Sequence, residues 1–428
     1  MTDTAAYTGA VSRPLPVSRI GAPARLGSER AAVMLTALAV ALLPLAVPTG
    51  PANAAPIDLF MAIATVACLM WAGAVGLRWR FPYAAPLAVF MAGGLLGALA
   101  GPVPAQGVIA IVQDLVLIVL CWVVVNLSRS PRNLSALASA WVYASIAWAT
   151  MPIIGVLVGS PTLTGQTENQ GSRVQITLAD PSYAANYFFI SIMLIWATGR
   201  PRHRSVRMVA YALLITAIVL TGSNSGVLSL LAGIAVAGVL GIYRRFGGMP
   251  AVAALVGLVL VGALASHSVN LTKIEDSAQS SQYAFVRDGI GRGTSVSQRG
   301  MLLHESIRLL RSGGPLGEGP VSTKVRLEKA QAPFEKEAHD DYLAALIERG
   351  VIGFLGLLAL VFGIGYRSFA VSTATLSEGF AAVVARPNAI AGAVAGTLVA
   401  GSVYELLHVR HVWALFGIVA ALYIWARE

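Results

Sequence analysis

Two polar stretches interrupt an otherwise apolar chain and carry most of the side chains that could do chemistry. The first, residues 159–182, reads GSPTLTGQTENQGSRVQITLADPS, and the second runs from about residue 267 to 342 and ends in KEAHDDY. Arginines such as Arg173 and Arg299 can pair with anionic groups through a planar guanidinium, and His339 can exchange a proton near neutral pH. Site chemistry is therefore expected in these two stretches.

The elements that must position these residues are membrane helices. Of the 428 residues, 56% are hydrophobic and only 12% are charged, which excludes a water-soluble class. Apolar runs of about 18 residues or more can cross a bilayer, and because lipid satisfies no backbone hydrogen bonds they must be helices. We therefore predict an all-α polytopic transmembrane bundle of about twelve spans. The runs are 31–48, 57–77, 83–100, 106–127, 134–158, 182–199, 208–222, 225–243, 249–266, 343–366, 388–407 and 411–426.

The basic residues predict how the bundle is oriented. Seventeen of the 30 Lys and Arg residues precede the first span, follow an even-numbered span or close the chain. The short connections on the opposite side hold only Arg173 and Arg410. By the positive-inside rule the arginine-rich connections and both termini are cytoplasmic, and residues 159–182 and 267–342 are external. The formal charge of +10 is thus a signal of topology and implies no nucleic-acid partner.

The domain organisation follows from the same pattern. Residues 1–30 are expected to be a disordered cytoplasmic tail, 31–266 the first nine spans, 267–342 a long external loop and 343–428 the last three spans. The alternative for the first run is a signal peptide cleaved within PTGPANAAP. The external loop should hold an amphipathic helix in SQRGMLLHESIRLLRSGG, and a second helix should begin near His339 and run straight into the tenth span.

The long loop carries a resemblance to a known family. SQRGMLLHESIRLLRSGGPLGEGP, followed about twenty residues later by HDDYLAALIERGVIGFLG, resembles the O-antigen ligase and polymerase superfamily of bacterial membrane glycosyltransferases. The family's pattern is an arginine-led amphipathic helix, a Pro-Leu-x-Gly-x-Gly turn and a His-x-x-Tyr-Leu motif leading into a span. The matching residues are Arg299, Pro315, Leu316, Gly317, Gly319, His339, Tyr342, Leu343, Glu348, Gly350 and Gly353.

A second, weaker similarity lies upstream, and two departures accompany it. SRVQITLADPSYAANYF is similar to the segment that precedes an outer-face helix in the family, with Arg173, Asp180 and Asn186 in order. Where the family commonly has Ser-Arg at the turn into a span, this chain has LTGSNSG, with Asn224 in place of the arginine, and it has HDDY rather than HNxY. If the arginine of the family pattern holds the donor phosphate, the first departure means either that Arg173 holds it in this chain or that the donor site differs.

The resemblance implies a GT-C-like bundle and an inverting, metal-independent transfer of glycan from a polyprenyl diphosphate donor on the external face. Arg299 and His339 are the expected catalytic residues: the guanidinium stabilises the leaving diphosphate, and the imidazole accepts the proton of the acceptor hydroxyl. No cofactor is implied. The expected partners are the lipid-linked donor, a glycan or lipid acceptor, membrane lipids and other polysaccharide-assembly proteins. The expected substrate-binding residues are Arg173, Asp180, Asn186, Tyr342, Glu348 and Asn224.

Several polar residues have more than one interpretation. Asp114 lies inside the fourth span and could be a proton relay, or could orient an arginine such as Arg173. A metal site at His339, Asp340 and Asp341 is disfavoured because three adjacent residues cannot all face one ion on a helix. The glycines of the third span are expected to be helix contacts, and the polar residues at the outer ends of the last two spans are expected to close the bundle. These two groups are Gly93, Gly94 and Gly97, and Glu405, His408, Arg410 and His411.

Three functions remain open from the sequence. The first is the glycosyltransferase, as a polymerase or a ligase for O-antigen, capsule or exopolysaccharide. The second is a transporter or flippase of the lipid-linked oligosaccharide, which would need charged residues deep in several spans. The third is a relative of the cell-wall glycan polymerases of the shape and division machinery, with catalysis on a loop aspartate such as Asp340 or Asp341.

Overall fold

The computed structural model describes residues 22–50, 54–167, 171–268, 276–282, 287, 294–329 and 340–427. Apart from an isolated bridge between Leu376 and Arg427, this part of the chain contains helices and no strands. The helices are α1 (Ala22–Ala41), α2 (Pro56–Val75), α3 (Ala84–Ala100), α4 (Pro104–Leu127), α5 (Pro131–Val158), α6 (Pro161–Thr164), α7 (Pro181–Thr198), α8 (Arg204–Thr221), α9 (Asn224–Phe246), α10 (Gly248–Ser268), α13 (Thr294–Ser312), α14 (Ser322–Lys329), α15 (Asp341–Thr373), α16 (Glu378–Val383), α17 (Pro387–Ala400) and α18 (Arg410–Trp425).

The helices confirm an all-α polytopic membrane bundle. By length and composition α2, α4, α5, α8, α9 and α15 can each cross a membrane. Four shorter apolar helices accompany them, namely α3, the stretch Gly248–Leu264 of α10, α17 and α18. The remaining two of the twelve expected ranges are occupied by α1 and α7. The count of twelve spans stays a prediction.

Helix ends follow local sequence. Proline stands in the first turn of α2, α4, α5, α7 and α17, where its missing N–H costs no helical hydrogen bond. Glycines in the left-handed conformation end α2, α5, α7 and α8.

Two boundaries differ from expectation. The helix α1 begins at Ala22, inside the expected tail, because the alanine-rich segment favours helix and Glu29 bonds Asn133 of α5.

The second boundary that differs is in α15, which does not run straight. It begins at Asp341 but breaks at Gly350, whose backbone (φ 62°, ψ −168°) is not helical. The stretch 341–349 is therefore a short helical segment set apart from the longer membrane helix that follows it. We call residues 341–349 the entrance segment.

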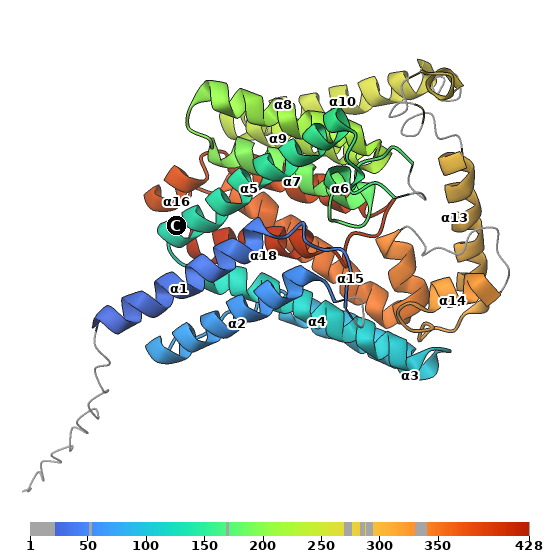
Figure 1. The fold of residues 1–428 in the computed structure, drawn as a ribbon, viewed down its shortest axis with the longest axis horizontal. Coiled ribbons are helices and arrows are strands. Elements are labelled where there is room, and N and C mark those ends of the chain that lie inside the picture. The colour runs from blue at the N-terminus through green and yellow to red at the C-terminus, as the bar shows by residue number, and fades with distance from the viewer. Residues whose placement is uncertain are drawn as a thin grey trace, which may run out of the picture.

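The connections lie at two opposite ends of the bundle (Figure 1). At one end, the basic end, Arg129 bonds the carbonyl of Arg78, Arg200 bonds that of Ser135, and the Arg386 N–H donates to Ala197. The chain's C-terminus lies at this end (Figure 1). At the other end, the loop end, α13 crosses the ends of the spanning helices and α14 follows it (Figure 1). Which of the two ends faces the cytoplasm stays a prediction.

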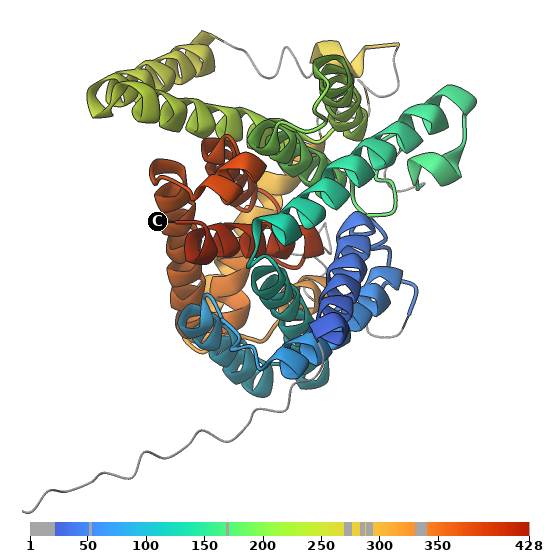
Figure 2. The ribbon, with the colours of Figure 1, turned by 90° about the vertical axis from the view of Figure 1, so that its left-hand side faces the viewer.

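The helices pack around α7, whose side chains are almost all buried. The closest pairs are α3 with α15 and α17 with α9, and α18 lies against α4. Seen along the bundle from the basic end, α9 and α10 lie on the side away from α1 to α4 (Figure 2). The bundle therefore holds the N-terminal ends of α7, α9, α15 and α18 together at the loop end, where most of the predicted site residues lie.

Candidate functional site

The segment around Arg173 lies against the end of α8. The Arg173 Nε donates to the carbonyl of Thr221 at 2.9 Å, and the Val174 N–H donates to Leu220 at 3.1 Å. Thr221 is the last residue of α8 and lies three residues before Asn224. Arg173, predicted from the sequence, is thus fixed beside the turn at which Asn224 replaces the arginine of the family pattern.

The N-termini of α7 and α9 meet at the same place. Asp180 caps α7 by accepting from the Ser182 N–H at 2.6 Å, and Ser223 caps α9. The hydroxyls of Ser182 and Ser223 are bonded at 3.2 Å. Asn224 is the exposed first residue of α9. The Asp180 carboxylate already offsets the positive end of α7, so the groups here that suit an anionic ligand are Arg173 and the N-terminus of α9.

Asn186 lies one turn deeper in α7 and is buried. Its Oδ1 atom is 3.0 Å from Nε2 of His411, which lies in the first turn of α18. Nearby, the Tyr183 hydroxyl bonds His408, and Arg410 makes a two-bond ion pair with Asp58 at 2.7 and 2.6 Å. These contacts join α2, α7 and α18 and agree with a polar cluster that closes the bundle.

Tyr183 and Asp58 were not singled out from the sequence. Tyr183 lies within the DPSYAAN motif, and Asp58 lies at the start of the second span. A polar or ionisable side chain near the end of a span is the sequence feature that could have indicated a functional role for each. Neither partner could be assigned from sequence, because each lies more than two hundred residues from the side chain that it meets.

The entrance segment begins at two aspartates with different partners. Asp340 caps it by accepting from the N–H groups of Tyr342 and Leu343 at 2.8 and 3.0 Å. Burial raises the pKa of Asp340, although these two hydrogen bonds oppose the shift. Asp341 is buried and accepts from the N–H groups of Leu406 and Leu407. Both carboxylates therefore accept hydrogen bonds from backbone N–H groups.

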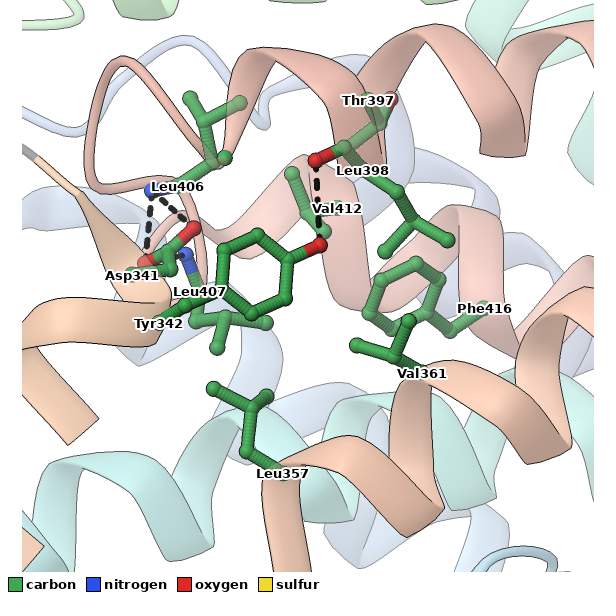
Figure 3. A pocket seen from close by; sticks show the side chains of 11 residues that line it. Asp341, Tyr342, Leu357, Val361, Thr397, Leu398, Leu406, Leu407, Val412 and Phe416 are labelled. Carbon is green, nitrogen blue, oxygen red and sulfur yellow. Dashed lines mark hydrogen bonds between the residues drawn. The ribbon is translucent and has the colours of Figure 1, made fainter. Parts of the chain in front are cut away.

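Figure 3 shows the small pocket beneath this point. The Tyr342 hydroxyl crosses it to donate to the carbonyl of Leu398 at 3.1 Å. Leu357, Val361 and Phe416 line its lower side, so it is mainly apolar. Tyr342, predicted to bind substrate, thus ties the entrance segment to α17. His339, the predicted base and one of the three residues of the metal site considered with it, lies outside the described residues.

Glu348 is turned inward, toward the long loop. Its Oε1 atom accepts from the Thr323 N–H at 3.4 Å, at the start of α14. The turn PLGEGP, residues 315–320, lies across the break in α15. The N–H groups of Glu318 and Gly319 donate to Ile347 and Glu348 at 3.0 and 2.8 Å, and the Val351 N–H donates to Pro315 at 2.9 Å. The two halves of the late motif are thereby bonded to each other.

A buried apolar cluster ties α13 to the entrance segment. Leu309 of α13 and Leu327 of α14 form one buried cluster with Ile347. Arg299 lies in α13, but its side chain lies outside the described residues. The helix that carries Arg299 and the segment that follows His339 are thus parts of one packed unit at the loop end.

Asp114 has a partner that the sequence did not identify. Its Oδ2 atom is 2.5 Å from Nη2 of Arg349, and both side chains are buried. The expectation that Asp114 orients an arginine holds, but the arginine is Arg349 and not Arg173. Arg173 lies instead at the end of α8.

The glycines of the third span are helix contacts, as expected. A Cβ atom on Gly93 would lie 2.3 Å from the backbone nitrogen of Gly353, and one on Gly97 would lie 2.5 Å from the carbonyl oxygen of Glu348. Gly97 also faces Gly319 of the turn. The close approach of α3 therefore supports both the entrance segment and the turn.

Comparison with known proteins places the late motifs. Residues 209–358 match the family model described as O-antigen ligase. The match confirms the resemblance for this part of the chain, which includes Arg299, the PLGEGP turn, His339, Glu348 and Asn224. Arg173, Asp180 and Asn186 lie outside it. No curated protein matches the chain.

The match also bears on the class of the protein. The chain is a multi-pass membrane protein, and lipid-linked glycans are the substrates that the matched family implies. Among the described residues, no group of three His, Cys, Asp or Glu side chains could hold a metal ion. The roles of the individual site residues stay predictions.

Proposed function

We propose that this protein is a membrane glycosyltransferase that transfers or polymerises glycan from a polyprenyl diphosphate donor on the external face. The observation that carries the proposal is the bonded unit formed by the PLGEGP turn and the entrance segment within the matched range. This unit joins the two motif halves that carry Arg299 and His339. Arg173, fixed at the N-termini of α7 and α9, lies at the same end of the bundle.

The proposed chemistry is a single inverting displacement. The acceptor hydroxyl oxygen forms the new bond to the anomeric carbon while the bond from that carbon to the diphosphate oxygen breaks. The hydroxyl proton passes to His339, and the electron pair leaves with the diphosphate. Arg299 and Arg173 stabilise the charge that develops on this leaving group.

Two observations favour this function over the alternatives. A transporter needs charged groups that are free to change partners within the spans, but Asp114 is paired with Arg349 in a buried site. A polymerase that uses a loop aspartate needs an available carboxylate, but Asp340 and Asp341 each accept backbone hydrogen bonds. A reaction with His339 as the base requires neither a mobile charged group within the spans nor a free loop carboxylate.

Glycan analysis of a deletion strain tests the proposal. The strain is complemented with wild type, Arg173→Ala, Arg299→Ala or His339→Ala, and with Arg245→Ala, an exposed arginine at the basic end, as the control. Accumulation of single lipid-linked repeats indicates a polymerase, and unattached long chains indicate a ligase. Normal glycan in the His339 and Arg299 variants would refute the assigned roles, and normal glycan in the uncomplemented strain would refute the function.

Cysteine labelling tests the proposed face. The native Cys68 and Cys121 are buried and give a low background. Ser402→Cys at the loop end and Ser205→Cys at the basic end are matched substitutions of exposed serines. A membrane-impermeant maleimide should label Ser402→Cys in intact cells, and Ser205→Cys only after lysis. The reverse result would place the site on the cytoplasmic face.

A further inference from the structure

Arg349 occupies an unusual position at the end of the entrance segment. It is the last residue before the break at Gly350 and is only 9% exposed. Its Nη2 atom pairs with Asp114, and its guanidinium lies 4.0 Å above the ring of Phe90. Asp114 lies ten residues into α4, about 15 Å from the helix start at 1.5 Å per residue. The pair therefore lies well inside the bundle.

Glycines at three positions allow close packing around Arg349, two of them against its side chain and one against its carbonyl group. A Cβ atom on Gly94 would lie 2.6 Å from Nη1, and one on Gly353 would lie 2.3 Å from the Cβ of Arg349. A Cβ atom on Gly93 would lie 2.7 Å from the Arg349 carbonyl oxygen. The facing surfaces of α3 and α15 are thus shaped around this arginine, which a pairing formed by chance would not require.

The Arg349 side chain fixes the end of the entrance segment that lies next to the break, while Asp341 and Tyr342 hold its other end. The break at Gly350 removes the continuous helix that would otherwise set the direction of the entrance segment. The turn bonds its last carbonyls, those of Ile347 and Glu348, and the Arg349 side chain anchors it to α4 through Asp114. In the sequence, the opposite end of the segment begins two residues after His339.

We propose that Arg349, paired with Asp114, is a positioning residue of the transfer reaction. The pair holds the end of the entrance segment next to Gly350, and with it the position of this segment relative to α13, the helix that carries Arg299. This inference rests on the proposed function. The buried pair does not touch substrate, so its loss lowers the turnover and leaves donor binding unchanged.

A role in positioning can be separated from a role in stability by replacing both members of the pair. Removal of one member of a buried ion pair leaves an uncompensated charge, whereas replacement of both by apolar side chains of similar size is often neutral or stabilising. The double variant Asp114→Leu/Arg349→Met should therefore fold but lose the directional constraint. Small misplacements of reacting groups can lower a rate about 100-fold.

The test uses the full chain, purified and reconstituted in lipid nanodiscs, with a polyprenyl diphosphate-linked glycan as donor and its natural acceptor. The kcat, the KM for the donor and the unfolding temperature are measured for wild type, the double variant and Arg349→Lys. Lysine keeps the charge pair with Asp114 but lacks the planar group over Phe90, and it is the second variant in case the double variant does not fold. Arg367→Lys is the matched control. Arg367 lies in α15, as Arg349 does, but nearer the basic end, and its guanidinium likewise lies over an aromatic ring, that of Tyr83.

We expect the double variant to keep the unfolding temperature and the KM, with kcat about 100-fold lower, and Arg349→Lys to lose about tenfold in kcat. Arg367→Lys should match wild type. Wild-type kcat in a folded double variant or in Arg349→Lys overturns the inference, and so does a raised KM with unchanged kcat, which would indicate direct substrate contact. Inactive wild-type protein refutes the proposed function instead.

Discussion

Gly93→Ala should force α3 and α15 apart. The new Cβ atom would lie 2.3 Å from the backbone nitrogen and 2.5 Å from the Cα atom of Gly353. Both are backbone atoms of the facing helix, so no side-chain rotation can relieve the contact. Ordinary contact begins at 3.4 Å, which means that the helices must separate by about 1.1 Å at this point.

The expected cost of Gly93→Ala follows from two opposing effects. Overpacking of a well-packed interior costs about 1–3 kcal/mol, and a gap of this size forfeits part of the dispersion energy along the rest of the interface. Alanine recovers up to about 1 kcal/mol through its better helix propensity. A net loss of about 2 kcal/mol is therefore expected, which lowers the unfolding temperature of a chain of this length by about 2 °C.

Thermal unfolding of the purified protein, followed by tryptophan fluorescence, measures this change. Gly238→Ala is the matched control, because Gly238 lies within α9 and a Cβ atom there meets nothing within 4 Å. The control should unfold at or slightly above the wild-type temperature. If Gly93→Ala behaves like the control, α3 and α15 do not approach as closely as described, and the support that α3 gives to the entrance segment is wrong.

Three further predictions concern the loop end. Gly350→Ala should destabilise the protein by about 1–3 kcal/mol in the same unfolding assay, because alanine strains a positive φ and its Cβ would lie 2.3 Å from the carbonyl carbon of Leu316; an unchanged melting temperature contradicts this. Arg410→Ala should lower the free energy of unfolding by about 1–3 kcal/mol, because it removes two charge-assisted hydrogen bonds to Asp58. The Arg410→Ala/Asp58→Asn double variant should lose less stability than the sum of the single variants, and additive losses would mean that the pair is not coupled. Burial raises the pKa of Glu318 above its usual 4.5 despite the pairing with Arg326, so ionisation of this group opposes folding. Stability should therefore fall as the pH rises from about 4.5 through the raised pKa. Glu318→Gln should remove this part of the pH profile of stability, and a profile identical to that of wild type refutes the prediction.

The sequence predicted the spanning helices well because their signal is local. An apolar run in lipid has one way to satisfy its backbone groups, so the expected ranges and the described helices agree to within a few residues for most spans. The amphipathic helix expected in SQRGMLLHESIRLLRSGG is found as α13, Thr294–Ser312. The break at Gly350 was not predicted, because its cause is the PLGEGP turn that bonds the helix from outside.

The candidate site was predicted only in part. Arg173, Asp180 and Asn224 were selected from separate motifs, and the structure brings their segments together at the N-termini of α7 and α9. Glu348 was selected as a substrate-binding residue, and its carboxylate faces the Thr323 N–H. A motif specifies the residue types, but the direction of a side chain depends on the neighbouring helices.

By itself the sequence determined the class of the protein. Its hydropathy requires membrane helices, its arginines separate the two ends of the bundle, and its late motifs carry the similarity to the O-antigen ligases. These properties are encoded in runs and short spacings along the chain.

Only the tertiary structure decided which distant groups meet. Asp114 pairs with Arg349, Asp58 with Arg410, and Asn186 with His411. Each pair joins helices far apart in sequence, and many arginines, aspartates and histidines were available as partners. The choice depends on which helix faces approach closely, and for Arg349 this is set by the glycines of α3 and α15 that leave room for its guanidinium.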